Sequence, residues 1–497
     1  MSDAYSFLDF RFKRFGQYIL LVNDIGEYQF LQEDQFKSFV NKCLDTKSEL
    51  FLNLQSKHMA VIDHIPQVIN FLATAYRTKK RYLYDFTSLH MFVVTHRCNQ
   101  NCIYCHASSI SDNNNTHYDM SAETGRKCVD VALKSPSKNL KFEFQGGEPL
   151  LNFEVIKEIV EYTKKIISNH SRRIDFVVCT NLTMLKDEHL LFFKQNKISI
   201  STSLDGPKEI HDQHRKKRDG DGSHELVKKN INWASEYLGS DQVSALLTVT
   251  KSNLNHLDMV IDEYVKTNFS SIFLRMINPH GTALDHWQKV GYSVEEFLKA
   301  YKKALNFIIN INNKGIFFVE EFAALLLTKI LTPFATGFVD LQSPTGGGLG
   351  GASYEINGDV FIADEARMLA KRTGDNFFCL GNIFKDSYES MFCGKKIFEL
   401  AKSTTIESLP GCAWCVYQPY CGSDPVRSYI ESGSSGQSQA KSDFCKKHKA
   451  IFDMLFQSLY KNEDRVIDVF WSWITRKNLS EIRIEDATCH EEFCFQS

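Results

Sequence analysis

The sequence predicts an α/β protein built around a partial (β/α)6 barrel, and two observations support this fold class. Apolar runs rich in β-branched residues recur in the middle of the chain, at residues 89–95, 140–146, 174–180, 198–204, 243–249 and 271–277. Amphipathic segments with helical spacing, such as 152–167 and 224–238, separate most of these runs. Alternating strands and helices predict parallel pairing, and in such folds functional side chains collect at the carboxyl ends of the strands.

Composition and charge are those of an ordinary globular protein. The formal net charge of −2 gives no electrostatic case for nucleic acid or a membrane surface as a partner. The first residues lack the apolar core of a secretion signal, and no run approaches the roughly 18 apolar residues of a membrane span. We therefore expect a cytoplasmic protein in which the 14 cysteines stay reduced and serve metal binding or catalysis.

Five segments are expected along the chain. Short strand patterns followed by helical patterns predict a small winged-helix-like module at the N-terminus. The barrel comes next, then a helical linker, then a cysteine-rich domain that opens with a hairpin turning at Asn357-Gly358, and last a helical tail. The expected bounds are 1–85, 86–290, 291–340, 341–455 and 456–497.

A first cysteine cluster follows the first predicted barrel strand. Cys98, Cys102 and Cys105 fall within eight positions, and three thiolates in one loop can hold three irons of a [4Fe–4S] cluster while the fourth iron stays open. The alternative is a zinc site, which wants a fourth ligand that His106 could supply.

With Tyr104 inside the loop, this spacing resembles the signature of the radical S-adenosylmethionine (SAM) family. Gly146-Gly147-Glu148-Pro149, after the second predicted strand, is similar to that family's motif for the methionine amino group. The resemblance covers about residues 88–285. It implies a radical SAM partial barrel and a [4Fe–4S] cluster whose open iron binds the amino and carboxylate groups of SAM. It also implies that a 5′-deoxyadenosyl radical abstracts hydrogen from the substrate.

Further SAM contacts are implied by the same resemblance. Ser203 and Arg215 resemble the pair that holds the ribose and carboxylate in related maturases, and a guanidinium suits a carboxylate. Tyr104 would pack beside adenine or shield the cluster. Asn181, after the third strand, would contact SAM or only stabilise a turn. The rest of the charged run beyond Arg215, residues 216–218, is expected to be solvated.

A second cysteine cluster comprises Cys412, Cys415, Cys421 and Cys445. Its spacing also suits a structural zinc site. Given the first cluster, an iron–sulfur site is favoured, and the stretch resembles the SPASM extension of peptide-modifying radical SAM enzymes. That resemblance implies an auxiliary [4Fe–4S] cluster. The other cysteines, at 43, 128, 179, 379, 393, 489 and 494, are expected to be small buried apolar residues.

SPASM extensions usually carry ligands for two auxiliary clusters, and this chain lacks those of one. By the family pattern the missing positions fall on Thr345, Ala363 and Pro425, none of which can replace a thiolate on iron. The resemblance therefore implies two [4Fe–4S] clusters in all, one that binds SAM and one auxiliary.

Nearly the whole chain resembles the radical SAM maturases of His-Xaa-Ser peptide systems. The resemblance rests on the stretches 331–344, 364–370 and 418–426. It implies modification of a ribosomally made precursor peptide, a second radical SAM maturase as partner, and an electron donor such as ferredoxin or flavodoxin. The N-terminal module resembles a precursor-recognition domain, with a plain cap on the barrel as the alternative. Two other functions stay open: a formylglycine-generating sulfatase-maturase-type oxidase, and a zinc-binding interaction protein without activity.

Asp364 is a candidate catalytic base. It ends the predicted hairpin, where the sulfatase-maturase group carries a catalytic Asp, and cross-linking or oxidation of a peptide needs a proton removed. The alternative is a helix cap or a salt bridge within residues 364–367.

Overall fold

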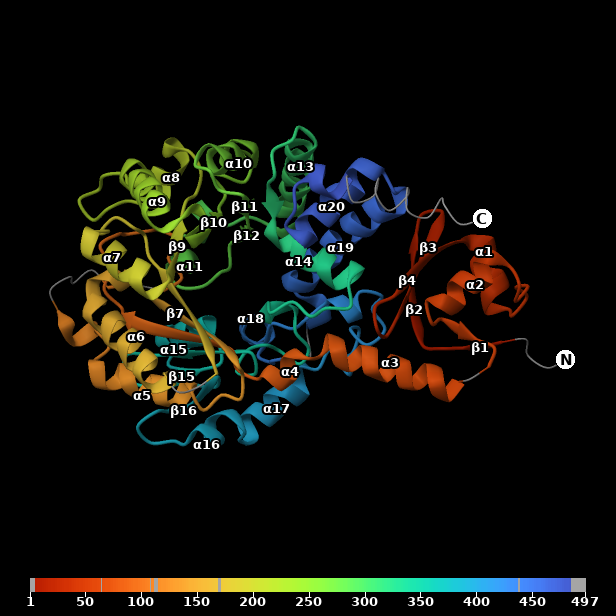
Figure 1. Ribbon diagram of the computed structural model, residues 1–497, viewed down its shortest axis with the longest axis horizontal. Helices are drawn as coiled ribbons and strands as arrows, with labels where there is room; N and C mark the ends of the chain where they lie inside the picture. Colours follow the sequence, from red (N-terminus) through yellow and green to blue (C-terminus); the bar gives the residue numbers. More distant parts are fainter. Residues whose placement is uncertain are drawn as a thin grey trace. The chain divides into compact units, whose positions relative to one another are not determined.

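The computed structural model (Figure 1) describes residues 5–63, 65–107, 109–110, 115–168, 171–436 and 439–483. The chain divides into two compact units, each assembled from three stretches. The module unit comprises residues 1–83, 325–346 and 401–463, and the barrel unit comprises 84–324, 347–400 and 464–497. The part of the predicted tail from 484 to 497, with Cys489 and Cys494, lies outside the described residues.

A nine-stranded sheet organises the barrel unit. Its order is β12 (Leu274–Met276), β10 (Val243–Val249), β9 (Ile198–Ser203), β8 (Arg173–Cys179), β7 (Asn139–Gly146), β6 (Leu89–Thr95), β14 (Gly351–Tyr354), β15 (Asp359–Phe361) and β16 (Cys379–Asn382). All pairings from β12 to β14 are parallel, so the expectation of a barrel-like parallel sheet is confirmed. The last three strands are antiparallel and include the predicted hairpin.

The sixth predicted strand differs from expectation because it is interrupted. Residues 271–277 form two short strands, β11 (Ser271–Ile272) and β12, with Phe273 between them. β11 leaves the main sheet and pairs with β13 (Val319–Glu320), whereas β12 stays beside β10. The sequence pattern does not reveal this change of partner, because buried apolar residues lie in both halves of the run.

Amphipathic helices cover the strands of the barrel unit, as Figure 1 shows for α5, α6 and α7. Aromatic rings fill the space between them: Phe92 lies 5.0 Å from Phe142, which lies 5.9 Å from Phe176. The helices that connect barrel strands are α5 (Ala122–Ala132), α6 (Phe153–Ile167), α7 (Asp187–Asn196), α8 (Lys208–His214), α9 (His224–Leu238) and α10 (Leu257–Lys266). The later ones are α11 (Thr282–Asp285), α12 (Trp287–Val290), α13 (Val294–Asn313), α15 (Asp364–Thr373), α16 (Tyr388–Phe392), α17 (Lys395–Thr404), which crosses the unit boundary, and α20 (Asp464–Thr475).

The module unit begins with a three-stranded antiparallel sheet, followed by two helices that bury its core. The strands are β2 (Phe10–Phe15), β3 (Tyr18–Asn23) and β4 (Tyr28–Gln32), and α1 (Glu33–Val40) and α2 (Glu49–Ser56) follow. The other elements here are β1 (Ser6–Phe7), β5 (Ala60–Val61), α3 (Ile65–Lys79), α4 (Tyr82–Asp85), α14 (Glu321–Leu331), α18 (Pro425–Ser432) and α19 (Asp443–Lys461), of which α4 and α14 cross the unit boundary.

The N-terminal sheet is tied to the cysteine-rich stretch of its own unit. Arg11 Nε donates to the carbonyl of Ala413 (2.6 Å), and the Tyr420 hydroxyl donates to the carbonyl of Gly26 (2.8 Å). The ring of Tyr18 stacks on that of Tyr460, 3.5 Å between centroids. These contacts join segments about 400 residues apart.

Within the described part of the chain, no helix has the length and apolar character needed to cross a membrane.

A buried carboxyl group joins β13 to the rest of the barrel unit. Glu320 is fully buried, accepts hydrogen bonds from the Tyr301 hydroxyl and the Ala323 amide, both at 2.6 Å, and also accepts one from the Leu274 amide. Burial raises the pKa of Glu320 from 4.5 to about 7, although these hydrogen bonds oppose the shift.

We expect the protonated form of Glu320 to stabilise the barrel unit at low pH. Because its pKa is higher in the folded state, the stabilisation is complete below about pH 4.5 and is lost as the pH rises through about 7. The difference is on the order of 3 kcal/mol. In thermal melts between pH 5 and 8, Glu320→Gln should lose this part of the pH dependence. Glu154→Gln, at an exposed position, should retain the wild-type profile. Parallel profiles for wild type and Glu320→Gln would contradict the assignment.

Candidate active site

The first three cysteines lie in the loop that follows β6, at the carboxyl edge of the parallel sheet. Cys98 is buried, and Cys102 and Cys105 are half-buried. Burial raises the pKa of Cys98 to about 12 and that of Cys102 to about 11, and Cys105 acts electrostatically on both. The structure therefore brings the three thiols together, and as free groups Cys98 and Cys102 are protonated, so metal binding would release protons.

Two glycines, the last residue of β7 and the one after it, let the backbone of the next loop touch the cysteine loop. The Gly147 amide donates to the Thr95 carbonyl (2.9 Å), and the Glu148 amide donates to the Arg97 carbonyl (2.8 Å). A Cβ on Gly146 would lie 2.1 Å from the Thr95 oxygen, and one on Gly147 would lie 2.1 Å from the Arg97 oxygen. Only glycine permits this contact at both positions.

Glu148 is fully buried at the same edge. Its carboxylate accepts hydrogen bonds from the Thr180 hydroxyl (2.6 Å) and from the amides of Asn181 (2.7 Å) and Leu150 (3.0 Å). Burial raises its pKa, and these three donors oppose the shift. Glu148 thus fastens the end of β8 to the end of β7 and retains lone pairs for one more donor.

Asn181 connects the third barrel strand to the cysteine loop. Its Oδ1 accepts hydrogen bonds from the amide and hydroxyl of Thr183, and its Nδ2 donates to Asn99 Oδ1 (2.9 Å). The side chain therefore closes a turn and also holds a residue next to Cys98.

A buried polar chain runs beside the three cysteines. The Tyr104 hydroxyl donates to Asp205, and Arg215 donates to the Tyr104 oxygen (2.8 Å) and to Gln100 Oε1 (3.4 Å). Arg215 Nε and Gln100 Nε2 are buried donors without a hydrogen-bond partner. An anionic group bound at this place would satisfy donors that otherwise carry an energetic cost.

Two arginines stabilise the cysteine loop through hydrogen bonds and an ion pair. Arg97 forms a buried pair with Asp119, through Nε at 2.8 Å, and also donates to the Leu151 carbonyl. Arg218 donates to the carbonyls of Cys98 (2.7 Å) and Ile110 (3.1 Å). The expectation that residues 216–218 are all solvated is therefore wrong for Arg218, because the loop carbonyls need donors and this guanidinium reaches them.

The remaining predicted positions lie around the same edge. Ser203 is the last residue of β9 and is half-buried. His106 Nε2 is buried without a partner; burial lowers the pKa of His106 to about 3. Its ring packs at 6.0 Å from that of His280. Thr282 donates to the Cys105 carbonyl through both its amide and its hydroxyl, at 3.0 Å each.

Asp364 begins α15 and forms an ion pair. Its carboxylate accepts from Arg367 Nε (2.9 Å), and Arg367 also faces Glu355 at 3.4 Å. Glu355 in turn lies 2.6 Å from His96 Nε2. Burial opposes ionisation of Glu355, but the hydrogen bond from His96 and the charge of Arg367 hold its pKa at about 2. The salt bridge that the sequence left as an alternative for Asp364 is present.

The second group of cysteines gathers in the module unit. Burial raises the pKa of Cys421, and the neighbouring thiols Cys415, Cys445 and Cys412 raise it further. Burial likewise raises the pKa of Cys412 to about 11. The loop between Cys412 and Cys415 presents Trp414 to solvent. Thus the four cysteines, although spread over 34 positions of sequence, lie together.

The other cysteines only partly follow expectation. Cys128 is buried and Cys179 and Cys379 are half-buried, but Cys43 and Cys393 are exposed, so the prediction of small buried residues is wrong for these last two. Cys43 follows α1 and Cys393 follows α16, where the chain turns at the surface. A cysteine without a spacing pattern gives no signal of its exposure.

The chemistry of the first three cysteines fits an iron–sulfur cluster. Among the residues that the structure describes, no three His, Cys, Asp or Glu side chains are arranged around one metal position. A [4Fe–4S] cluster joins each thiolate to a different iron, so its ligands are spaced more widely. The unpartnered donors Arg215 Nε and Gln100 Nε2 beside three thiols also fit a site for a cluster with an anionic ligand.

Comparison with known proteins identifies the family. Residues 92–264 match the model of the radical SAM superfamily. An uncharacterised protein of Methanocaldococcus jannaschii is 31% identical over 256 residues, which are 48% of this chain and 83% of that protein. The chain belongs to the radical SAM superfamily, and it is therefore an enzyme whose family implies SAM and a [4Fe–4S] cluster.

Two further comparisons add a related enzyme and a solved structure of similar fold. The cysteine-type anaerobic sulfatase-maturating enzyme of Clostridium perfringens (strain 13) is 25% identical over 373 residues, 73% of this chain and 94% of the enzyme. The structure of Streptococcus suis SuiB bound to precursor peptide SuiA aligns with a TM-score of 0.52 and 12% identity. That alignment covers 89% of this chain and all of SuiB. The second similarity concerns the fold alone.

Gly147→Ala should disrupt the cysteine loop without unfolding the chain. The new Cβ would meet the Arg97 oxygen at 2.1 Å and the Cys98 Cβ at 2.9 Å, and backbone atoms have no room to move aside. About four irons per chain, those of one cluster on this loop, should be lost after anaerobic reconstitution, while circular dichroism stays that of wild type. Gly337→Ala is the matched control, because nothing lies within 4 Å of its Cβ position. Full iron loading of Gly147→Ala would show that the close contact is dispensable.

Proposed function

We propose that this radical SAM enzyme modifies a ribosomally made precursor peptide. The observation that carries the proposal is the loop of Cys98, Cys102 and Cys105, faced by the unpartnered donors of Arg215 and Gln100. Similarity to a sulfatase-maturating enzyme and, in fold, to SuiB bound to its precursor peptide supports a peptide as the substrate. Because the chain belongs to the radical SAM superfamily, the alternative of a zinc-binding protein without activity is set aside.

In this proposal different residues around the cysteine loop bind the cluster and the separate groups of SAM. Cys98, Cys102 and Cys105 hold the cluster. The backbone of Gly146 and Gly147 and the Glu148 carboxylate receive the amino group. When bound, the reduced cluster and SAM supply a 5′-deoxyadenosyl radical that abstracts a hydrogen atom.

Arg215 has the best geometry for the SAM carboxylate, because its guanidinium is buried, held by Tyr104, and retains a free Nε donor. Ser203 is assigned to the ribose, and Tyr104 to the adenine side. Asn181 orients the cysteine loop through Asn99 and is assigned to SAM only as a second role.

A second [4Fe–4S] cluster is proposed on Cys412, Cys415, Cys421 and Cys445. All four thiols lie together in the module unit, which supports a shared ligand set. Position 425 is a proline that begins α18, behind the capping side chain of Asp424, so it serves a helix start where the family pattern has a ligand. Two clusters per chain follow, about eight irons.

The N-terminal sheet is proposed to receive the precursor peptide. Its order is β2-β3-β4, so among the described strands the outer edge of β2 pairs with none, and Phe12 on β2 is half exposed. A peptide strand could add to this edge through main-chain hydrogen bonds. His-Xaa-Ser repeats in that peptide, a second maturase, and ferredoxin or flavodoxin as electron donor complete the proposal.

Formylglycine formation is the second candidate function, favoured by the sulfatase-maturating relative. Its substrate would be a Cys or Ser residue of a sulfatase sequence in place of a short precursor peptide. Incubation with both kinds of peptide, followed by mass spectrometry, separates the two functions.

Replacing Cys98, Cys102 and Cys105 together with Ala should abolish 5′-deoxyadenosine production. It should also lower bound iron from about eight to about four per chain, because only the auxiliary site remains. Iron analysis, Mössbauer spectroscopy and chromatography of the SAM products after anaerobic reconstitution measure both effects. Retained 5′-deoxyadenosine would overturn the assignment of the loop. About eight irons left in this variant would show that a third cluster exists.

Asp364→Asn decides between a base and an ion-pair partner. Asn offers the same acceptor to Arg367 but cannot take a proton, and the ion pair of 2.9 Å favours the structural role. We therefore expect the variant to modify the co-expressed precursor peptide as wild type does, by mass spectrometry of the peptide. Loss of modification with unchanged 5′-deoxyadenosine formation would instead establish Asp364 as the base.

A further inference from the structure

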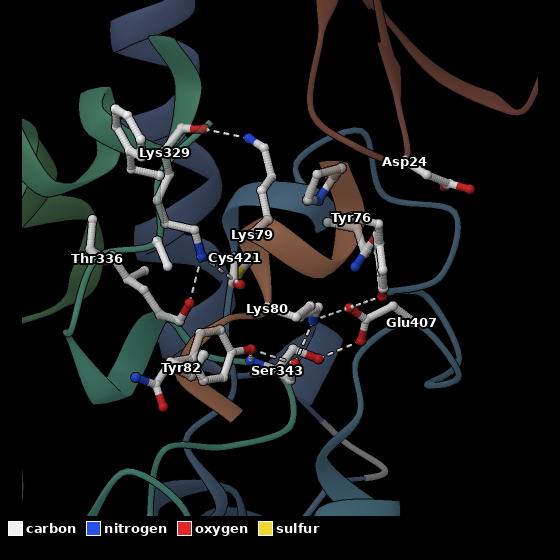
Figure 2. A pocket seen from close by; sticks show the side chains of 16 residues that line it. Asp24, Tyr76, Lys79, Lys80, Tyr82, Lys329, Thr336, Ser343, Glu407 and Cys421 are labelled. Atoms are coloured by element: carbon white, nitrogen blue, oxygen red, sulfur yellow. Dashed lines mark hydrogen bonds and ion pairs between the residues drawn. The ribbon is translucent and has the colours of Figure 1, made fainter. Parts of the chain in front are cut away.

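Two lysines of the module unit lie against the second group of cysteines. Lys329, on α14, donates from Nζ to the carbonyls of Leu341 (2.5 Å) and Cys421 (3.4 Å). Lys449 follows Cys445 by one turn of α19, and its ammonium acts electrostatically on that thiol. Both are half-buried. Figure 2 shows Lys329 and Cys421 side by side in the wall of a pocket.

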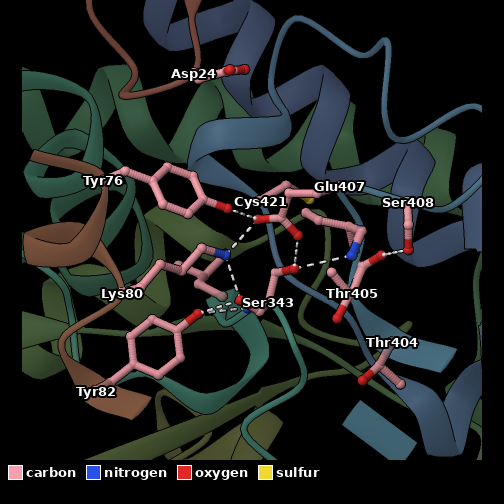
Figure 3. A network of polar contacts seen from close by, with 12 residues as sticks. Asp24, Tyr76, Lys80, Tyr82, Ser343, Thr404, Thr405, Glu407, Ser408 and Cys421 are labelled. Carbon is pink, nitrogen blue, oxygen red and sulfur yellow. Dashed lines mark hydrogen bonds and ion pairs between the residues drawn. The ribbon is translucent and has the colours of Figure 1, made fainter. Parts of the chain in front are cut away.

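No carboxylate of the described residues forms an ion pair with Lys329. Glu407 lines the same pocket, but it is occupied by Lys80 (2.5 Å), Tyr76 (3.1 Å) and the Ser343 hydroxyl, as Figure 3 shows. In the part of the chain that the structure describes, no ion pair joins Lys329 to a carboxylate. Burial lowers the pKa of Lys329 to about 7, and Cys421 is the acidic group that opposes this shift most strongly.

Asp24, the other acidic residue of the pocket wall, is also used. It pairs with Arg11 at 2.6 Å, which is the arginine that holds the Ala413 carbonyl between two of the cysteines. The acidic groups of the pocket are therefore neutralised by other cations. The charge of Lys329 needs a further anion, because a cation taken out of water without a partner is costly.

Lys449 repeats this arrangement from another element. All four thiols, Cys445 first and then Cys415, Cys412 and Cys421, act electrostatically on its ammonium. As neutral thiols they would offer little to either lysine. As thiolates on an iron–sulfur cluster they would form a compact anionic group beside both.

We propose that Lys329 and Lys449 are the counter-charges of the cluster on Cys412, Cys415, Cys421 and Cys445, and that they raise its reduction potential. The proposal rests on the auxiliary cluster of the proposed function. Each one-electron reduction adds one negative charge to the cluster. Two fixed cations nearby stabilise the reduced form more than the oxidised form, because Coulomb attraction grows with that charge.

The test uses the full chain with Cys98, Cys102 and Cys105 replaced by Ala, so that only the auxiliary cluster is observed. Lys329→Met and Lys449→Met are made in this background and titrated with dithionite under electron paramagnetic resonance. Each should weaken reduction about tenfold or more, a midpoint about 59 mV lower for one electron. Lys461→Met is the control, since Lys461 is exposed at the end of the same helix as Lys449. Its potential should equal that of the background.

The charge-conserving variants separate electrostatics from packing. Lys329→Arg and Lys449→Arg should keep the potential of the background. If Lys329→Met fails to fold, the pair Lys449→Met and Lys449→Arg decides, because Lys449 lies on a helix surface. Iron present with unchanged potentials in the Met variants would overturn this inference. Absence of iron in the background itself would instead overturn the auxiliary cluster of the proposed function.

Discussion

The candidate active site depends on one close contact between two loops. Gly146 and Gly147 let the backbone after β7 approach Thr95 and Arg97 so tightly that any side chain would collide. The hydrogen bonds made there fix the start of the cysteine loop, and Glu148, the next residue, then ties the loop to β8. The loop that carries the three thiols is anchored by this backbone contact. Backbone packing therefore sets the separation of the thiols, and flexible side chains do not.

Local patterns predicted the elements well where the determinant is local. The strands β6 and β10 have the predicted bounds, since apolar β-branched runs end at polar residues there. The cysteine spacing likewise predicted a shared site. By contrast, the Tyr104–Asp205–Arg215 chain joins residues more than 100 positions apart, and Asp205 carries no signal beyond its place after β9. The prediction that Arg218 is solvated failed for the same reason, because its partner carbonyls belong to a distant loop.

The polar groups of the two sites are satisfied in different ways. Around Cys98 the carboxylates and guanidiniums mostly pair with one another, and the unpartnered atoms include the donors Arg215 Nε and Gln100 Nε2. Around Cys421 the carboxylates are saturated, and the cations rest on backbone carbonyls. Both arrangements leave positive character facing thiols, which is the character that an anionic cofactor requires.

The division of each unit into three stretches has a consequence for synthesis of the chain. The polypeptide passes from one unit to the other five times, so neither unit is complete in any contiguous fragment. The N-terminal sheet leaves the ribosome with Gly26 exposed, 394 residues ahead of the tyrosine that will cover it. At about 5–20 residues per second this interval lasts on the order of 20 to 80 s. During it, the aromatic face of the nascent sheet is open to chaperones and to other nascent chains.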